Sequence, residues 1–345
     1  MLAVRTAVFA CLVLAACDGN PFVAPDSGPT PGSNGSVSTL TSTLSGKPSS
    51  TGSIERTEVH GTGPSIDGSA PDVVGNGYAQ DYTYDAKTDK FKIDNLAFDG
   101  GNTYKRSASL PNLGAAQVYE AASSYADPQT GQNIDQLSYR ALYGVSTTGR
   151  TKFAIVRTGS YIPYGFGGFI YSRNGGVVLP TNGQARYNGA YSGLRDFNGT
   201  AGLQYTSADM EVDIDFNDFN PNEGLNGKGI QGIVDNRKIF DLAGNDITAT
   251  VLAGINADKN TSMTELPALL FKIGPGHLDL NGELEGQVNN KIFDANGNPK
   301  EFESGKYYAV ISGSKADEMV GIIVVTSDIK GITARETGGF ILYRP

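Results

Sequence analysis

The chain has 345 residues, with 45 Gly, 16 Pro, no Trp and a formal net charge of −9. This length allows two domains of ordinary size, and the many Gly and Pro residues indicate a turn-rich chain. A general nucleic-acid binder needs clustered Lys and Arg on one face, and the sequence has no such cluster. The charge is compatible with a protein partner that carries a basic patch.

The first residues carry the most specific signal. Arg5 precedes an apolar run over residues 7–16 that is too short to span a bilayer and leads into Leu-Ala-Ala-Cys, ending at Cys17. This segment resembles a bacterial lipobox, which implies cleavage before Cys17, acylation of that residue and export. Acyl chains, at about 0.8 kcal/mol per buried CH2, would then hold the chain on a membrane. The alternative is an ordinary secretory signal followed by a Cys.

Two neighbouring residues bear on this prediction. Cys11 lies in the segment that would be removed, so the mature chain would keep no thiol for a disulfide, a metal site or a nucleophile. Asp18 follows the anchoring Cys, and in enteric bacteria this residue type disfavours transfer to the outer membrane. The resemblance thus implies a cell-envelope lipoprotein, either of the outer membrane and displayed on the surface, or on the periplasmic face of the inner membrane.

The next stretch predicts a tether. Residues 17–70 begin with Cys17 and are mostly Ser, Thr, Gly, Pro and Asn, so they cannot bury enough apolar surface to offset the entropy lost on ordering. A coil of this length reaches about 40 Å. We therefore expect a signal peptide over residues 1–16 and a disordered linker over residues 17–70.

Residues 71–180 predict a smaller β-rich domain. Tyr82 to Asp85 and Phe91 to Leu96 flank a short turn and indicate a hairpin. Further short runs separated by turn residues complete a sheet of five or six strands. These runs are Gln117–Tyr125, Leu137–Val145, Lys152–Thr158 and Gly167–Tyr171.

An aromatic and glycine-rich segment lies near the end of this domain. Tyr161, Tyr164, Phe166 and Phe169 combine large side chains with a flexible backbone, which makes them candidate contacts for a partner. The alternative, which the pattern favours, is a strand bent at glycine that packs its aromatic residues onto the next domain.

Residues 181–345 predict an antiparallel β-barrel. From Met210 to Phe216, apolar residues alternate strictly with three carboxylates, as a strand with one dry and one wet face requires. Eight such strands can close around their own side chains and leave no exposed edge. The expected strands are Arg186–Gly193, Gly202–Tyr205, Ala208–Phe216, Gly227–Val234, Leu278–Val288, Tyr307–Ser312, Met319–Thr326 and Thr337–Tyr343. An insertion over Arg237–Ala268 predicts a surface loop with a short helix from Ile247 to Ile255.

Several segments of this second domain resemble a known family. The segments are Ala185–Gly193, Gly202–Tyr205, Asp213–Phe216, Gly227–Ile230, Gly305–Gly321 and Thr337–Arg344. They are similar to the barrel domain of the family that includes transferrin-binding protein B and the meningococcal factor H binding protein. The resemblance covers Gln184 to Pro345. It implies an all-β lipoprotein with an eight-stranded antiparallel barrel, preceded by a smaller handle-like β domain and a disordered tether.

Candidate chemistry is sparse. The run from Asp294 to Asn298 and the carboxylates near Asp215 lack the Gly and Glu positions of a calcium loop, so plain turns are favoured. His60 and His277 have no partners at ligand spacing. Asp213 lies on a solvated strand face, where raised pKa values are not expected. We therefore expect no catalytic residue, no cofactor and no metal.

The leading hypothesis is a lipid-anchored, non-enzymatic envelope protein that captures a protein or solute ligand and delivers it to an outer-membrane receptor. The second is a structural lipoprotein that packs on a permanent protein partner. A periplasmic hydrolase is the third.

Overall fold

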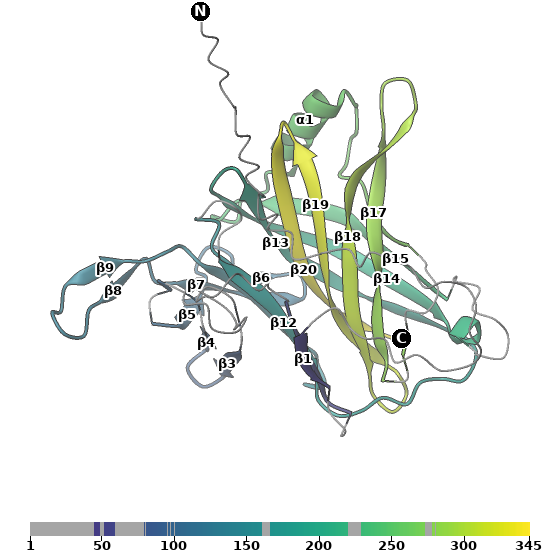
Figure 1. Ribbon diagram of the computed structural model, residues 1–345, viewed down its shortest axis with the longest axis horizontal. Coiled ribbons are helices and arrows are strands. Elements are labelled where there is room, and N and C mark those ends of the chain that lie inside the picture. The colour runs from purple at the N-terminus through teal and green to yellow at the C-terminus, as the bar shows by residue number, and fades with distance from the viewer. Residues whose placement is uncertain are drawn as a thin grey trace, which may run out of the picture.

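The computed structural model describes residues 45–48, 52–58, 79, 81–94, 96, 98–99, 101–160, 166–219, 229–272, 278–279 and 281–345 (Figure 1). Within these residues the chain is mainly β, as the sequence predicts, and it forms an open sheet followed by a closed barrel. No helix in this part of the chain is long and apolar enough to cross a membrane.

The first part is a ten-stranded antiparallel sheet, here called the handle-like sheet. Its order is β1-β2-β12-β11-β10-β7-β5-β4-β3, and β6 pairs with β7. The strands are β1 Ser45–Pro48, β2 Ile54–Thr57, β3 Tyr82–Asp85, β4 Lys90–Ile93, β5 Thr103–Arg106, β6 Asn112–Leu113, β7 Ala116–Ala121, β10 Arg140–Val145, β11 Thr151–Arg157 and β12 Gly167–Arg173. The hairpin β8 Ser124–Ala126 and β9 Asn133–Asp135 forms a separate two-stranded sheet that projects from the body (Figure 1).

This sheet corrects two predictions. It has ten strands rather than five or six, whereas the predicted hairpin near residue 86 is confirmed as β3 and β4. The predicted tether over residues 17–70 is wrong for residues 45–48 and 52–58, because β1 and β2 lie there and β2 pairs with β12. Ile54 is 3% exposed, so an apolar side chain anchors β2 in spite of its polar surroundings.

The second part is a closed barrel of eight antiparallel strands, in chain order, with β13 paired to both β14 and β20. Its elements are β13 Gln184–Asn198, β14 Leu203–Asp215, the 3-10 turn η1 Phe216–Phe219, β15 Ile230–Phe240, α1 Thr248–Lys259, β16 Leu269–Lys272, β17 Glu283–Phe293, β18 Pro299–Ser312, β19 Glu318–Ile329 and β20 Ile332–Tyr343. The predicted strand number and closure are confirmed.

Individual barrel strands differ from the prediction. Gly202–Tyr205 and Ala208–Phe216 belong to the single strand β14, which continues through an irregularity between Ser207 and Asp209. The missing eighth strand is β16, Leu269–Lys272, which joins β15 to β17. A four-residue strand after a long insertion carries too short a pattern to be recognised.

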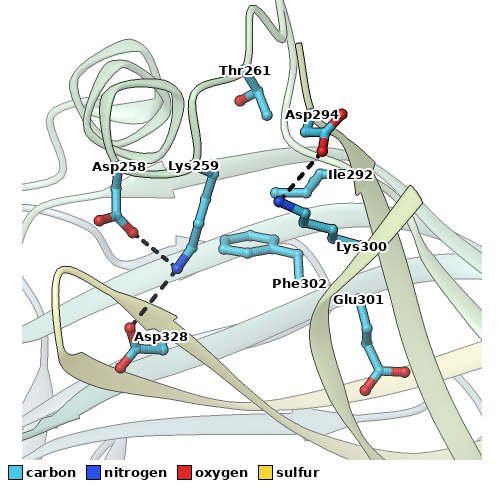
Figure 2. A pocket seen from close by; sticks show the side chains of 9 residues that line it. All are labelled: Asp258, Lys259, Thr261, Ile292, Asp294, Lys300, Glu301, Phe302 and Asp328. Atoms are coloured by element: carbon cyan, nitrogen blue, oxygen red, sulfur yellow. Dashed lines mark ion pairs between the residues drawn. The ribbon is translucent and has the colours of Figure 1, made fainter. Parts of the chain in front are cut away.

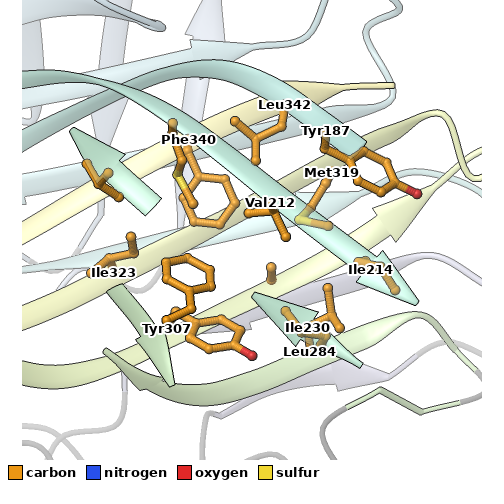
Figure 3. Close-up of a cluster of buried hydrophobic side chains, with 14 of the residues drawn as sticks. Tyr187, Val212, Ile214, Ile230, Leu284, Tyr307, Met319, Ile323, Phe340 and Leu342 are labelled. Atoms are coloured by element: carbon orange, nitrogen blue, oxygen red, sulfur yellow. The ribbon is translucent and has the colours of Figure 1, made fainter. Parts of the chain in front are cut away.

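Apolar side chains fill the barrel lumen (Figure 3). Met210, Val212 and Ile214 are 3%, 1% and 1% exposed, so the alternation in β14 correctly predicts its inner face. The rings of Phe271 and Tyr307 stack there with centroids 4.2 Å apart. Close packing of this kind leaves the lumen as a core rather than a channel.

The insertion is more ordered than predicted. Its first residues, up to Phe240, extend β15, and α1 runs to Lys259 instead of ending at Ile255. Buried side chains from α1 and from β15, β17 and β18 form one cluster at an end of the barrel. The members are Ile239, Leu252, Ile255, Leu266, Ile292 and Phe302.

The handle-like sheet packs on the outer wall of the barrel. Side chains of β10, β11 and β12 share a cluster with outward-facing residues of β18, β19 and β20. The ring of Phe153 lies against Gly339. A Cβ atom added to Gly339 would lie 2.4 Å from that ring. The two parts therefore meet through an apolar interface in which Phe153 is fully buried.

Candidate functional site

Several residues singled out in the sequence lie outside the described residues, among them Cys17, Tyr161, Tyr164, His60 and His277. In the part of the chain that the structure does describe, no group of three or more His, Cys, Asp or Glu side chains could hold a metal ion.

The other two candidate partner contacts are placed. Phe166 is half-buried against the aromatic cluster on the far face of the handle-like sheet. Phe169 is fully buried in β12, and its ring stacks with that of Tyr308 at 6.4 Å between centroids. Phe169 is therefore not accessible to a soluble partner, and it packs onto the barrel as the alternative interpretation expects.

The barrel lumen contains a buried ionic network near the end covered by α1. Arg237 binds Glu303 through two hydrogen bonds of 2.5 and 3.0 Å, and its Nη2 lies 3.1 Å from an oxygen of Glu336. Asn290 donates to Glu303 at 2.5 Å, and the Tyr191 hydroxyl donates to Glu336 at 2.9 Å. The partners come from five strands, so the network ties opposite walls of the barrel together.

Burial and ion pairing shift the pKa values of Arg237 and Glu303 in opposite directions. Burial alone would lower the pKa of Arg237, but the two glutamates outweigh it and raise the pKa above its ordinary value. Burial alone would raise the pKa of Glu303, but Arg237 outweighs it and holds that pKa below its usual range. Both groups are therefore charged at neutral pH, and each depends on its partner.

The network also connects to the insertion. Arg237 donates a hydrogen bond of 2.9 Å to the carbonyl oxygen of Pro267, which precedes β16. Among the described residues, buried apolar side chains and this buried network both occupy the lumen.

A polar cleft of about 310 Å³ lies outside the lumen, between the end of α1 and the β17–β18 hairpin (Figure 2). Lys259 lies 2.9 Å from Asp258 and 3.8 Å from Asp328, and Lys300 lies 3.4 Å from Asp294. Figure 2 shows the ring of Phe302 between the two lysine side chains. The lining residues are Asp258, Lys259, Thr261, Ile292, Asp294, Lys300, Glu301, Phe302 and Asp328.

The turn from Asp294 to Asn298 is a plain hairpin turn, as predicted. The carboxylate of Asp294 accepts hydrogen bonds from the backbone N–H groups of Asn296 and Asn298 at 2.9 and 3.0 Å. The bond from Asn298 is the main cause that holds the pKa of Asp294 below its usual range. Sequence reasoning missed the surrounding cleft, because its walls come from segments far apart in the chain.

Comparisons with known proteins found distant matches among solved structures. No family model matches the chain, and no curated protein matches it. Among solved structures, a variant of transferrin-binding protein B from Haemophilus parasuis has 13% sequence identity and a TM-score of 0.35, over 85% of this chain and 52% of that chain. The chain thus spans about half the length of that protein.

Two further structures give a similar result. Isotype 1 transferrin-binding protein B from serogroup B Neisseria meningitidis has 13% identity and a TM-score of 0.31, over 85% of this chain and 59% of that chain. A protein described as a surface lipoprotein has 12% identity and a TM-score of 0.32, over 59% of this chain and 80% of that chain. These similarities are distant, and no ligand carries over from these proteins to this chain.

Proposed function

We propose that the chain is a lipid-anchored binding protein of the cell envelope, held at the outer membrane by Cys17, that captures a protein or solute ligand for an outer-membrane receptor. The lipobox that ends at Cys17 supports the anchor. The closed lumen carries the binding part of the proposal, because it leaves the outer surfaces as the place where recognition occurs.

The shape of these surfaces favours a protein over a small solute. Small-molecule sites are mostly apolar pockets that enclose most of the ligand. The cleft beside α1 is instead lined mainly by charged side chains, and its two lysines already bind carboxylates of the chain. A protein ligand needs only a broad surface with some apolar anchors.

Such anchors are present on the described surface. Phe98, Tyr125 and Ile134 are 63%, 41% and 46% exposed, and Tyr125 is paired with Ile134 across the projecting β8–β9 hairpin. Isolated exposed apolar residues are common, but an exposed apolar pair on a projecting hairpin is accessible to a partner.

Binding can be tested with the soluble chain from residue 18 onward, immobilised and titrated with envelope receptors and with host or environmental proteins. We expect saturable binding of at least one protein to the folded chain and none to the same chain after urea unfolding. If a folded chain binds none of these proteins, the capture role is wrong. Protease treatment of intact cells then distinguishes surface display, in which the chain is cleaved, from a periplasmic location.

A further inference from the structure

The chain contains a repeat of ten residues that ends two strands of the barrel. Residues 236–245 read Asn-Arg-Lys-Ile-Phe-Asp-Leu-Ala-Gly-Asn, and residues 289–298 read Asn-Asn-Lys-Ile-Phe-Asp-Ala-Asn-Gly-Asn. Seven of the ten positions are identical. The first copy closes β15 and the second closes β17.

The two copies fold into the same turn. The N–H group of Asp241 donates to the carbonyl of Asn245 at 3.0 Å, and that of Asp294 donates to the carbonyl of Asn298 at 3.1 Å. In each copy the Asp carboxylate accepts backbone N–H bonds from two and from four residues later, all at 2.9 or 3.0 Å. The glycine of each copy has a positive φ, 86° in the first and 79° in the second.

The inward-facing side chains of the two copies also make corresponding contacts. Ile239 and Ile292 are 2% and 4% exposed and belong to one cluster. Arg237 and Asn290, which occupy the second position of each copy, both bind Glu303. The copies therefore correspond in sequence, in turn geometry and in what their inner side chains contact.

Their outward faces differ, because the handle-like sheet covers only the first copy. The hydroxyl of Ser109, in the loop before β6, donates to the carbonyl of Leu242 at 3.3 Å. A Cβ atom on Gly244 would lie 3.5 Å from the Cβ of Leu110. Phe240 is partly buried in the same apolar cluster as Leu110.

The second copy has no such cover among the described residues. Phe293, which corresponds to Phe240, is 63% exposed. A Cβ atom on Gly297, which corresponds to Gly244, would meet nothing within 4 Å. The chain thus contains two copies of this surface, and among the described residues it covers only the first.

We propose that the outward face of the second copy, Phe293 with the turn over residues 294–298, is the docking site for a loop of a partner protein. The cover of the first copy defines the chemistry of that loop, which is a hydroxyl residue followed by an aliphatic residue. The hydroxyl donates to the carbonyl of Ala295, and the aliphatic side chain lies on Gly297 and against the Phe293 ring.

The occupant is a different protein rather than a second copy of this chain. The Ser109–Leu110 loop of every copy is already held against its own first repeat, so it is not free to bind the second repeat of a neighbour. This inference names a surface for the proposed binding role and rests on that role only in taking the occupant to be a protein.

The chain supplies its own probe for the test. A fluorescent peptide with the sequence of residues 106–113, Arg-Ser-Ala-Ser-Leu-Pro-Asn-Leu, is titrated with the full mature chain carrying Cys17→Ser, and its anisotropy is measured. We expect saturable binding that weakens about tenfold in Phe293→Ser, because the aromatic anchor of the site is lost. A peptide with Ala in place of Leu110 should weaken to a similar extent.

Val178→Ser is the matched control, because Val178 has the same exposed fraction of 63% but lies between β12 and β13, outside both copies of the repeat. The peptide should bind this variant as it binds the unchanged chain. Absence of saturable binding, or equal binding to both variants, would overturn the proposal. Self-association of the chain that disappears in Phe293→Ser would assign the surface to a second copy and overturn the choice of partner.

This test is independent of the receptor titration. The peptide binds or fails to bind whether or not an envelope receptor is found, so either proposal can fail while the other stands.

Discussion

At the scale of single residues, the buried charges of the lumen hold the barrel in one arrangement. The side chains of Arg237 and Glu303 are 4% and 5% exposed. If one of them is lost, water therefore cannot take its place beside the other. Breaking a buried ion pair by removing one partner costs about 3–5 kcal/mol, because it leaves an uncompensated charge. Polar residues thus stabilise this end of the barrel only as a complete set.

We predict that Glu303→Gln lowers the free energy of unfolding at pH 7 by about 3 kcal/mol, because Arg237 loses its nearest charged partner. The folded-state pKa of Glu303 is depressed, so its contribution is present above the unfolded pKa of about 4.3 and is lost as the pH falls further. The difference between the two proteins should therefore shrink below that pH. Urea unfolding at a series of pH values measures it.

Glu301→Gln is the control, because this exposed residue lies on the same strand and is bound by Asn289 at 3.0 Å. It should change the free energy of unfolding by no more than about 0.5 kcal/mol. A Glu303→Gln variant as stable as this control, or a difference that grows on acidification, would contradict the role given to the network.

At the scale of elements, β2 fastens the amino-terminal segment to both parts of the body. Arg56 of β2 binds Glu283 of the barrel strand β17 through two bonds of 2.6 and 2.7 Å. Glu58, which follows β2, lies 3.0 Å from Arg157 of β11. Arg157 also donates to Thr337 of β20 at 2.8 Å, so this contact reaches the interface between sheet and barrel.

We predict that a fragment beginning at residue 59 loses at least about 3 kcal/mol of folding free energy relative to one beginning at residue 45. Without β2, the buried Glu283 loses Arg56, Arg157 loses Glu58, and the edge of β12 is exposed. The fragment from residue 45 should unfold like the chain from residue 18. Guanidinium unfolding of the three proteins makes the comparison, and equal stability of all three would refute the clamping role of β2.

The elements also show which parts of the fold the sequence could predict. Strict alternation from Met210 to Phe216 predicted β14, because a one-residue slip would bury its carboxylates. The strands that carry Arg237 and Glu303 extend beyond the predicted ends. The sequence could not predict these extensions, because a charged residue in a strand normally indicates a face exposed to water. Arg237 and Glu303 bind each other although they are 66 residues apart in the chain, and no local pattern encodes such a pairing.

The tether boundary failed for the same reason. Glu55, Arg56 and Glu58 make the stretch before residue 59 resemble a polar linker, whereas Arg56 and Glu58 are 7% and 4% exposed. The sequence left Phe169 as either a partner contact or, as the pattern favoured, a packed residue, because a glycine-rich strand can display or bury its aromatic residues. The neighbouring barrel decides between the two, and it buries Phe169. The repeat that ends β15 and β17 was visible in the sequence, but the difference between its two outward faces required the coordinates.

At the scale of the whole molecule, a filled barrel supports the handle-like sheet on its outer wall and closes its own lumen with an ionic network. We expect a body packed in this way to position its surface residues without a large conformational change, which suits recognition of a protein. Attachment through one acylated residue would leave those outer surfaces free. We therefore propose a folded β body that would depend on Cys17 for its place at the membrane.

Fractionation of cells that express the native chain or Cys17→Ser tests this claim most directly. We predict that the native chain is found with the membranes and starts at an acylated Cys17 by intact mass. The variant should be exported, unacylated and recovered in the soluble fraction with the same β-type circular dichroism spectrum and thermal midpoint. A variant that remains with the membranes, or a native product whose Cys17 carries no lipid, would contradict the account.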